Sequence, residues 1–169
     1  MIKEDFSTIV RKVRIFSGII LFAYVIMHLL NHSVNLFSID AADAIRINYF
    51  RPIWQNPVGL FLLYGSLFAH LILGFASILN RKSFKMKGKD WIQIVFPVLA
   101  LLFLAQHIAI SFIITKIFGG EETYSLFFAA MNTEKPSDLI MGAIFFSLMT
   151  IFIWGHGVIG LDAYLKQQA

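Results

Sequence analysis

All five histidines of the 169-residue chain lie within long apolar segments, and their chemistry is the feature that needs an explanation. They are His28, His32, His70, His107 and His156, and the first two share the stretch YVIMHLLNHSVNLF. An ionisable side chain at bilayer depth is costly unless a partner, a proton or a metal compensates for its desolvation. Because each of four apolar segments carries an imidazole, we predict that these segments together bind haem through axial histidines.

The composition is that of an integral membrane protein, with 58% hydrophobic and 15% aromatic residues and a mean hydropathy of +0.74. Four long apolar segments predict an all-α fold, a bundle of four transmembrane helices. No linker or repeat divides residues 1–169, so we expect a single domain. Cysteine is absent, which excludes thiolate-ligated haem, cysteine-bound iron–sulfur clusters and disulfides from this chain. The cations beside the spans account for the net charge of +4, so no nucleic-acid partner is expected.

The alternation of apolar segments and charged loops predicts the topology. The spans cover about residues 15–37, 57–80, 91–116 and 138–165, each long enough for a hydrocarbon core of about 30 Å. The N-terminal segment has no cleavage pattern of a signal peptide. In the outer loop after the first span, we expect residues 40–50 to form a short interfacial helix. Ten of the 14 Lys and Arg residues fall on the side of the spans where the chain begins and ends, and this bias predicts that both termini are cytoplasmic. The ten are Lys3, Arg11, Lys12, Arg14, Lys166 and five in residues 81–89.

The depth of each histidine follows from counting residues at about 1.5 Å each from the charged inner end of its span. His70 and His156 come out roughly 15 and 14 Å deep, whereas His28 and His107 come out roughly 21 and 25 Å deep. The two layers are therefore on the order of 10 Å apart. Two b-type haems, each with axial imidazoles from two facing helices, need this arrangement. We predict an inner iron site at His70 and His156, and an outer one at His28 and His107.

His32 lies one turn from His28 on the same helix face, so spacing alone leaves either of them as the outer ligand. We favour for His32 a hydrogen bond to a haem propionate or to a quinone near the outer surface. Small residues beside the ligands can leave room for a porphyrin, and two H-x-x-x-G motifs place Gly74 and Gly160 one turn beyond the inner histidines. The alternative role of these glycines is close helix packing.

Four arginines near the span ends are candidates for binding the propionates, because guanidinium groups pair with carboxylates in bidentate geometry. Arg46 and Arg51 are on the predicted outer side, and Arg14 and Arg81 on the inner side. Their alternative role is interfacial anchoring. For the histidines, the alternatives to haem are interhelical hydrogen bonds, a proton path or a non-haem metal site. Zinc and non-haem iron are less favoured, because no carboxylate or cysteine lies at the depth of the histidines.

The histidines lie in four short motifs: HLLNHS at residues 28–33, AHLILGF at 69–75, AQHIAISF at 105–112 and GHGVIGL at 155–161. These four segments resemble the haem-bearing helices of the dihaem cytochrome b membrane anchors of succinate:quinone oxidoreductases. The similarity in order, spacing and loop length extends from about residue 14 to residue 165. The resemblance implies two haem b groups, with ligand pairs from helices one and three and from helices two and four. It also implies that His28, the first histidine of its motif, is the ligand rather than His32.

Respiratory anchors of this single-chain type have a fifth transmembrane helix, for which this chain has no residues. With HLLNHS and an outer loop that ends in WQNPVGLFLLYG, the chain looks more like the succinate-dehydrogenase-like membrane anchor of bacterial class III adenylate cyclases. In those proteins a cytoplasmic cyclase domain follows the fourth helix, so we expect an anchor cut from a longer protein. The resemblance also implies a bacterial inner membrane and a homodimer, because a class III cyclase forms its active site between two catalytic domains.

These features lead to three hypotheses about function. In the first, the dihaem module senses redox state or quinone and regulates a C-terminal cytoplasmic class III adenylate cyclase. In the second, it is the cytochrome b anchor subunit of a succinate:quinone oxidoreductase-type respiratory complex, with an iron–sulfur subunit over residues 81–89. The chain has no Gly-rich phosphate loop and no carboxylate cluster for magnesium, so we expect no catalytic site of its own. A third hypothesis, a haem-free anchor, predicts a colourless protein.

Overall fold

Four long helices make up most of the protein. The computed structural model describes residues 6–81, 83, 85, 87–117, 123–124 and 136–166, and every regular element in these residues is helical. All of the long helices are long and apolar enough to cross a membrane, which confirms the predicted all-α, four-span fold. They are α1 (Phe6–Val34), α4 (Pro57–Leu79), α5 (Gly88–Ile117) and α7 (Pro136–Lys166).

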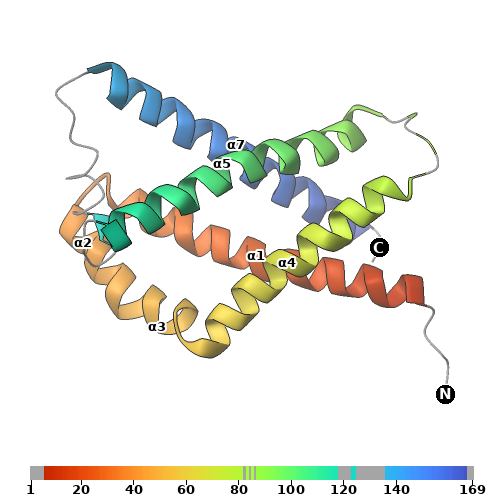
Figure 1. Cartoon of the computed structure of the whole chain (residues 1–169), viewed down its shortest axis with the longest axis horizontal. Helices are drawn as coiled ribbons and strands as arrows, with labels where there is room; N and C mark the ends of the chain where they lie inside the picture. Colours follow the sequence, from red (N-terminus) through yellow and green to blue (C-terminus); the bar gives the residue numbers. More distant parts are fainter. Residues whose placement is uncertain are drawn as a thin grey trace.

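The long helices are arranged as two pairs. Helix α1 packs along α4, and α5 packs along α7, while α1 and α7 make a smaller contact that joins the pairs. The start of α1, the end of α4, the start of α5 and the end of α7 lie toward the same end of the molecule, at the right of Figure 1. The connection between α1 and α4 lies at the opposite end. We label the first the inner end and the second the outer end, after the topology that the sequence predicts.

The surface of the long helices is largely apolar and uncovered. Several large apolar side chains on α1, α4 and α5 expose between 61% and 76% of their area. Examples are Leu30 on α1, Phe61 and Ile72 on α4, and Leu102 on α5. A contiguous apolar surface of this extent is unfavourable in water and matches the hydrocarbon core of a bilayer. The chain is therefore a multi-pass membrane protein whose helices contact lipid.

The first helix differs from its predicted bounds at both ends. The helix begins at Phe6, although the sequence predicts a span only from about residue 15. No Pro or Gly interrupts residues 6–14, and their cations can lie in the interface beyond the span, so the helix includes them. The helix ends at Val34 rather than at residue 37, because Asn35 and Leu36 turn back to the carbonyls of His32 and Ser33. The Gly119–Gly120 pair is a sequence signal for the end of the third span, and it lies outside the described residues.

The outer connection contains three short helical turns where one helix over residues 40–50 was predicted. They are α2 (Ile39–Ile45), a π-helical turn η1 (Arg46–Phe50) and α3 (Arg51–Trp54). Helix α2 begins at Ser38, whose Oγ accepts a hydrogen bond from the Ala41 N–H at 3.1 Å. A π-helical turn shifts the register of the side chains that follow it, which the apolar pattern of the sequence does not reveal.

Helix α4 begins where the sequence predicts, at the Asn56–Pro57 dipeptide. The Asn56 Oδ1 accepts hydrogen bonds from the N–H groups of Val58 and Gly59 at 2.9 and 3.0 Å, and Pro57 occupies the first helical position. Gly59 lies directly against α3, since a Cβ there would be 2.2 Å from the Ile53 carbonyl oxygen. Only glycine permits this tight connection, which holds α3 against α4.

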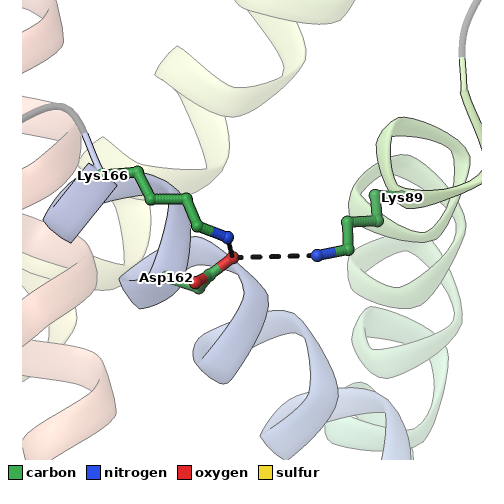
Figure 2. Close-up of polar contacts among 3 residues, drawn as sticks. All are labelled: Lys89, Asp162 and Lys166. Carbon is green, nitrogen blue, oxygen red and sulfur yellow. Dashed lines mark hydrogen bonds and ion pairs between the residues drawn. The ribbon is translucent and has the colours of Figure 1, made fainter.

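At the inner end, a polar contact joins α5 to α7. The Asp162 carboxylate binds Lys166 one turn on at 2.7 Å and reaches Lys89 of α5 at 4.0 Å. Figure 2 shows the carboxylate between the two ammonium groups. All three side chains are substantially exposed, so water and salt weaken the contact.

Candidate cofactor site

The histidines of the long helices form two pairs, each of which bridges the two helix pairs. Toward the inner end, the rings of His70 on α4 and His156 on α7 have centroids 6.0 Å apart and an interplanar angle of 72°. Toward the outer end, His28 on α1 and His107 on α5 also have centroids 6.0 Å apart, at 65°. The pairs are those that the depth count places in common layers. Each pair supplies two facing imidazoles from different helices.

The separation of each pair fits two imidazoles bound to opposite sides of one metal ion. A first-row metal lies about 2 Å from an imidazole nitrogen, and each nitrogen lies about 1.1 Å from its ring centre, so trans ligands have centroids about 6.2 Å apart. Both observed separations are 6.0 Å. In the described residues, no group of three or more His, Cys, Asp or Glu could complete a metal site. Two imidazoles suffice for a haem, because the porphyrin supplies the other four nitrogens.

A single cavity of about 850 Å³ runs between the helix pairs and contains both histidine pairs in its wall. Ligand pockets typically have volumes of about 300–1,000 Å³. All the residues predicted for the site line this cavity: His28, His32, His70, His107, His156, Gly74, Gly160, Arg14, Arg46, Arg51 and Arg81. Residues chosen from four separate segments of the sequence therefore lie on one internal surface.

The two glycines of the H-x-x-x-G motifs face open space. A Cβ added to Gly74 or to Gly160 would meet no atom of the described structure within 4 Å, and both residues line the cavity. Close helix packing, the alternative role, would place a neighbouring helix against them. By contrast, a Cβ at Gly157 would lie 2.5 Å from the Phe22 ring, so that glycine does serve helix packing. The open space over Gly74 and Gly160 leaves room beside the inner histidines.

The inner histidines differ in how their second ring nitrogen is bound. His70 Nδ1 lies 3.1 Å from the Arg14 carbonyl oxygen and 3.4 Å from the Ser17 hydroxyl. A carbonyl only accepts, so Nδ1 carries the hydrogen and the lone pair is on Nε2, the nitrogen available to a metal. His156 Nδ1 is buried and has no hydrogen-bond partner among the described residues. The two potential ligands therefore have unequal support.

The outer histidines include a third imidazole. His32 Nε2 lies 3.1 Å from His28 Nε2, so the two nitrogens converge on nearly the same point. The His28 ring faces His107 on one side and stacks on Tyr24 at 5.5 Å. The His32 ring instead contacts Tyr124 at 4.9 Å. A metal bound at His28 Nε2 would require the His32 ring to turn away, which leaves His32 beside the site rather than opposite His107.

A buried polar network that the sequence does not reveal lies at the outer end of the cavity. The Asn31 side-chain N–H donates to the Tyr124 hydroxyl at 3.0 Å, and the Tyr124 backbone N–H donates to the Asp43 carboxylate at 2.6 Å. Asn31 exposes 3% of its area, Tyr124 7% and Asp43 9%. Burial raises the pKa of the Tyr124 phenol, so the hydroxyl stays protonated. An asparagine inside an apolar span was the available signal, but its partner could not be identified from sequence.

The four arginines lie at the two ends of the cavity. Arg14 also donates to the Ser77 hydroxyl, a contact that ties α1 to α4 beside His70. Arg81 follows the end of α4, while Arg46 and Arg51 belong to the outer connection. Cationic groups at both ends suit a ligand with anionic groups near each surface, as a haem in each layer would have. Anchoring at the interface remains compatible with the same positions.

Trp54 has a different environment from the one its place in the sequence indicates. Its place beside a span in the sequence is typical of the aromatic belt at a membrane interface. In the structure its ring packs edge-on against Tyr24 at 5.3 Å and it lines the cavity. Its indole N–H is buried without a hydrogen-bond partner in the described part of the chain. Trp54 thus belongs to the wall of the outer site.

Comparison of the chain with protein-family models, with curated proteins and with solved structures finds no match in any of the three. The geometry of the cavity and the motifs of the sequence therefore carry the functional argument.

Proposed function

We propose that the chain is a dihaem b-type membrane module, with His70 and His156 as axial ligands of an inner haem and His28 and His107 of an outer haem. The observation that carries the proposal is that the four histidines form two pairs in the wall of one cavity. In each pair the ring centroids are 6.0 Å apart. Each separation is compatible with two imidazoles that hold one metal ion between them. When bound, each haem supplies a one-electron iron couple.

The protein's own residues would hold and orient these groups. The Arg14 carbonyl fixes the tautomer of His70, which leaves its Nε2 free to ligate. Gly74 and Gly160 leave space for the porphyrin edge, and the apolar side chains of the four helices exclude water from it. The arginines at the two cavity ends pair with propionates, and His32 hydrogen-bonds a propionate or a quinone at the outer end.

We further propose that the module senses redox state or quinone and passes the signal to a cytoplasmic class III adenylate cyclase as a homodimer in the bacterial inner membrane. The support is the resemblance of HLLNHS and the outer loop to such anchors, together with the Lys and Arg bias, which favours both termini on the cytoplasmic side. His28 on α1 and His156 on α7 would each hold one haem, and the start of α1 and the end of α7 lie at the inner end. These two helices would therefore connect the haems to the effector.

The second candidate is a cytochrome b subunit of a succinate:quinone oxidoreductase-type complex. The basic residues between α4 and α5 favour it, since they would form a docking surface for an acidic iron–sulfur subunit. The reading frame after Ala169 separates the two candidates: a cyclase domain supports the sensor, whereas a stop codon or a further span supports the respiratory subunit. Copurification of an iron–sulfur protein with the chain would also favour the second.

An optical spectrum of the detergent-purified protein tests the haem proposal. We expect sharp b-type bands after dithionite reduction and two haems per chain in a pyridine haemochrome assay. His70→Ala and His107→Ala should each reduce the content to one haem per chain. A protein without a Soret band after haem-supplemented expression would refute the proposal and return the histidines to a hydrogen-bonded or proton-conducting role.

A further inference from the structure

We infer that Ser17 and Gly18 of α1, together with the Arg14 carbonyl, form a seat for the His70 ring that sets its orientation and its electron donation to the inner iron. The inference rests on the proposed haem site and assigns positioning residues within it. Neither residue belongs to a sequence motif of the site, and neither is itself a ligand. We call these three groups the His70 seat.

The polar part of the His70 seat contacts Nδ1, the ring nitrogen that is not available to a metal. The Ser17 hydroxyl donates to the Arg14 carbonyl at 3.0 Å, and His70 Nδ1–H reaches the same oxygen at 3.1 Å. Ser17 exposes only 3% of its area, so no bulk water competes there. The Arg14 carbonyl also serves the hydrogen-bond ladder of α1. Ser17 and His70 therefore compete for its remaining acceptor capacity.

The apolar part of the His70 seat is the missing side chain of Gly18. A Cβ at this position would lie 3.0 Å from His70 Cε1 and 3.3 Å from Nδ1, closer than an ordinary van der Waals contact. Any larger residue would push the ring a few tenths of an ångström out of its place. Ligand rings have to be held close to their productive geometry, so a shift of this size matters at the metal.

The His70 seat also makes the inner ligands unequal. His156 Nδ1 has no hydrogen-bond partner in the described structure, whereas His70 Nδ1 has an acceptor. A ligating imidazole that donates its second N–H is more basic, which stabilises the ferric iron and lowers the reduction potential. The Ser17 Oγ lies 3.4 Å from His70 Nδ1, at the limit of a hydrogen bond, whereas it donates to the Arg14 carbonyl at 3.0 Å. Its main effect is therefore to take part of the acceptor capacity of that carbonyl, which weakens the donation from Nδ1. Ser17 therefore keeps the potential of the inner haem higher than the Arg14 carbonyl alone would.

The test is a redox titration of full-length Ser17→Ala with Ser33→Ala as the matched control. Ser33 lies on the same helix and makes the same bond to the carbonyl three residues before it, at 2.7 Å to Leu30, but far from His70. We expect Ser17→Ala to lower the midpoint potential of one haem. At a fixed ambient potential, the ferric-to-ferrous ratio of that haem should rise about threefold to tenfold, and a tenfold rise corresponds to a shift of about 59 mV. Ser33→Ala should titrate as the wild type.

A His107→Ala background assigns the shift, because only the inner haem remains there. Gly18→Ala supplies a second readout that does not depend on Ser17: the displaced ring should change the low-spin electron paramagnetic resonance signal of that haem. A rise or no change in potential for Ser17→Ala overturns the role of its hydroxyl, and an unchanged signal in Gly18→Ala overturns the role of the glycine. A chain that never binds haem refutes the proposed function instead, so the two failures are distinguishable.

Discussion

Filling the open space over Gly74 should abolish binding of the inner haem without weakening the fold. The proposed change is Gly74→Leu on α4, one turn beyond His70. Gly65→Leu on the same helix is the control, since a Cβ there also meets nothing within 4 Å, but Gly65 does not line the cavity. The two substitutions add the same side chain to the same helix. They differ in whether that side chain enters the cavity.

The expected magnitudes follow from this difference. Replacing a mid-helix glycine by a good helix former removes a propensity cost of about 1 kcal/mol. The Cβ of neither substitution meets an atom within 4 Å, so we expect neither apoprotein to lose stability. At Gly74, however, the leucine occupies the space that a porphyrin held by His70 would need. An overlap of even one methyl group with a rigid ring costs about 1–3 kcal/mol, and a whole isobutyl group cannot be accommodated. We expect one haem per chain in Gly74→Leu and two in Gly65→Leu.

The assay combines haem content with thermal unfolding of the purified apoproteins in detergent. Equal melting temperatures for the two variants show that the fold is unaffected, and the pyridine haemochrome value then reports only on the cavity. Two haems per chain in Gly74→Leu would show that no porphyrin lies over this glycine, and the assignment of the inner site would be wrong. Loss of haem from Gly65→Leu as well would point to a general effect of leucine on α4.

Three further predictions concern the outer site and the inner surface. Tyr124→Phe should destabilise the protein by roughly 1–3 kcal/mol in chemical unfolding, because the buried Asn31 N–H loses its acceptor; an unchanged stability would mean that water replaces the hydroxyl. His28→Ala should leave one haem per chain while His32→Ala leaves two, and the opposite result in the haemochrome assay would make His32 the ligand. Lys89→Ala should leave the melting temperature unchanged at any salt concentration, since its ion pair is long and exposed.

The fold and the two histidine layers could be predicted from sequence because both depend on regular geometry. A helix rises by a constant distance per residue, so counting from a charged end places His28 with His107 and His70 with His156. The structure brings together the same pairs. Apolar length and loop charge likewise suffice to find four spans. No knowledge of side-chain contacts was needed for either prediction.

Contacts between helices could not be predicted, because they depend on helix rotation and on the path of the loops. Nothing in the sequence indicates that Gly18 faces His70, since an apolar helix in lipid has no polar face to fix its rotation. The hydrogen bond from Tyr124 to Asp43 joins residues that are 81 positions apart, and it forms because Tyr124 lies beside α2. The π-helical turn at residues 46–50 changes the register of the side chains that follow it, and among these Trp54 packs against Tyr24.

The distribution of ligands over the helices predicts that haem holds the two halves of the bundle together. Contacts within the α1–α4 pair and within the α5–α7 pair are extensive, whereas the halves meet mainly at α1 and α7 with the cavity between them. Each proposed haem takes one histidine from each half. A ligand at a hundred times its dissociation constant stabilises the folded state by about 2.7 kcal/mol, so added haem should raise the melting temperature of the apoprotein. The double variant His28→Ala/His70→Ala should melt at the same temperature with and without haem. If haem raises both melting temperatures equally, it binds outside the histidine pairs, and the halves are held by protein contacts alone.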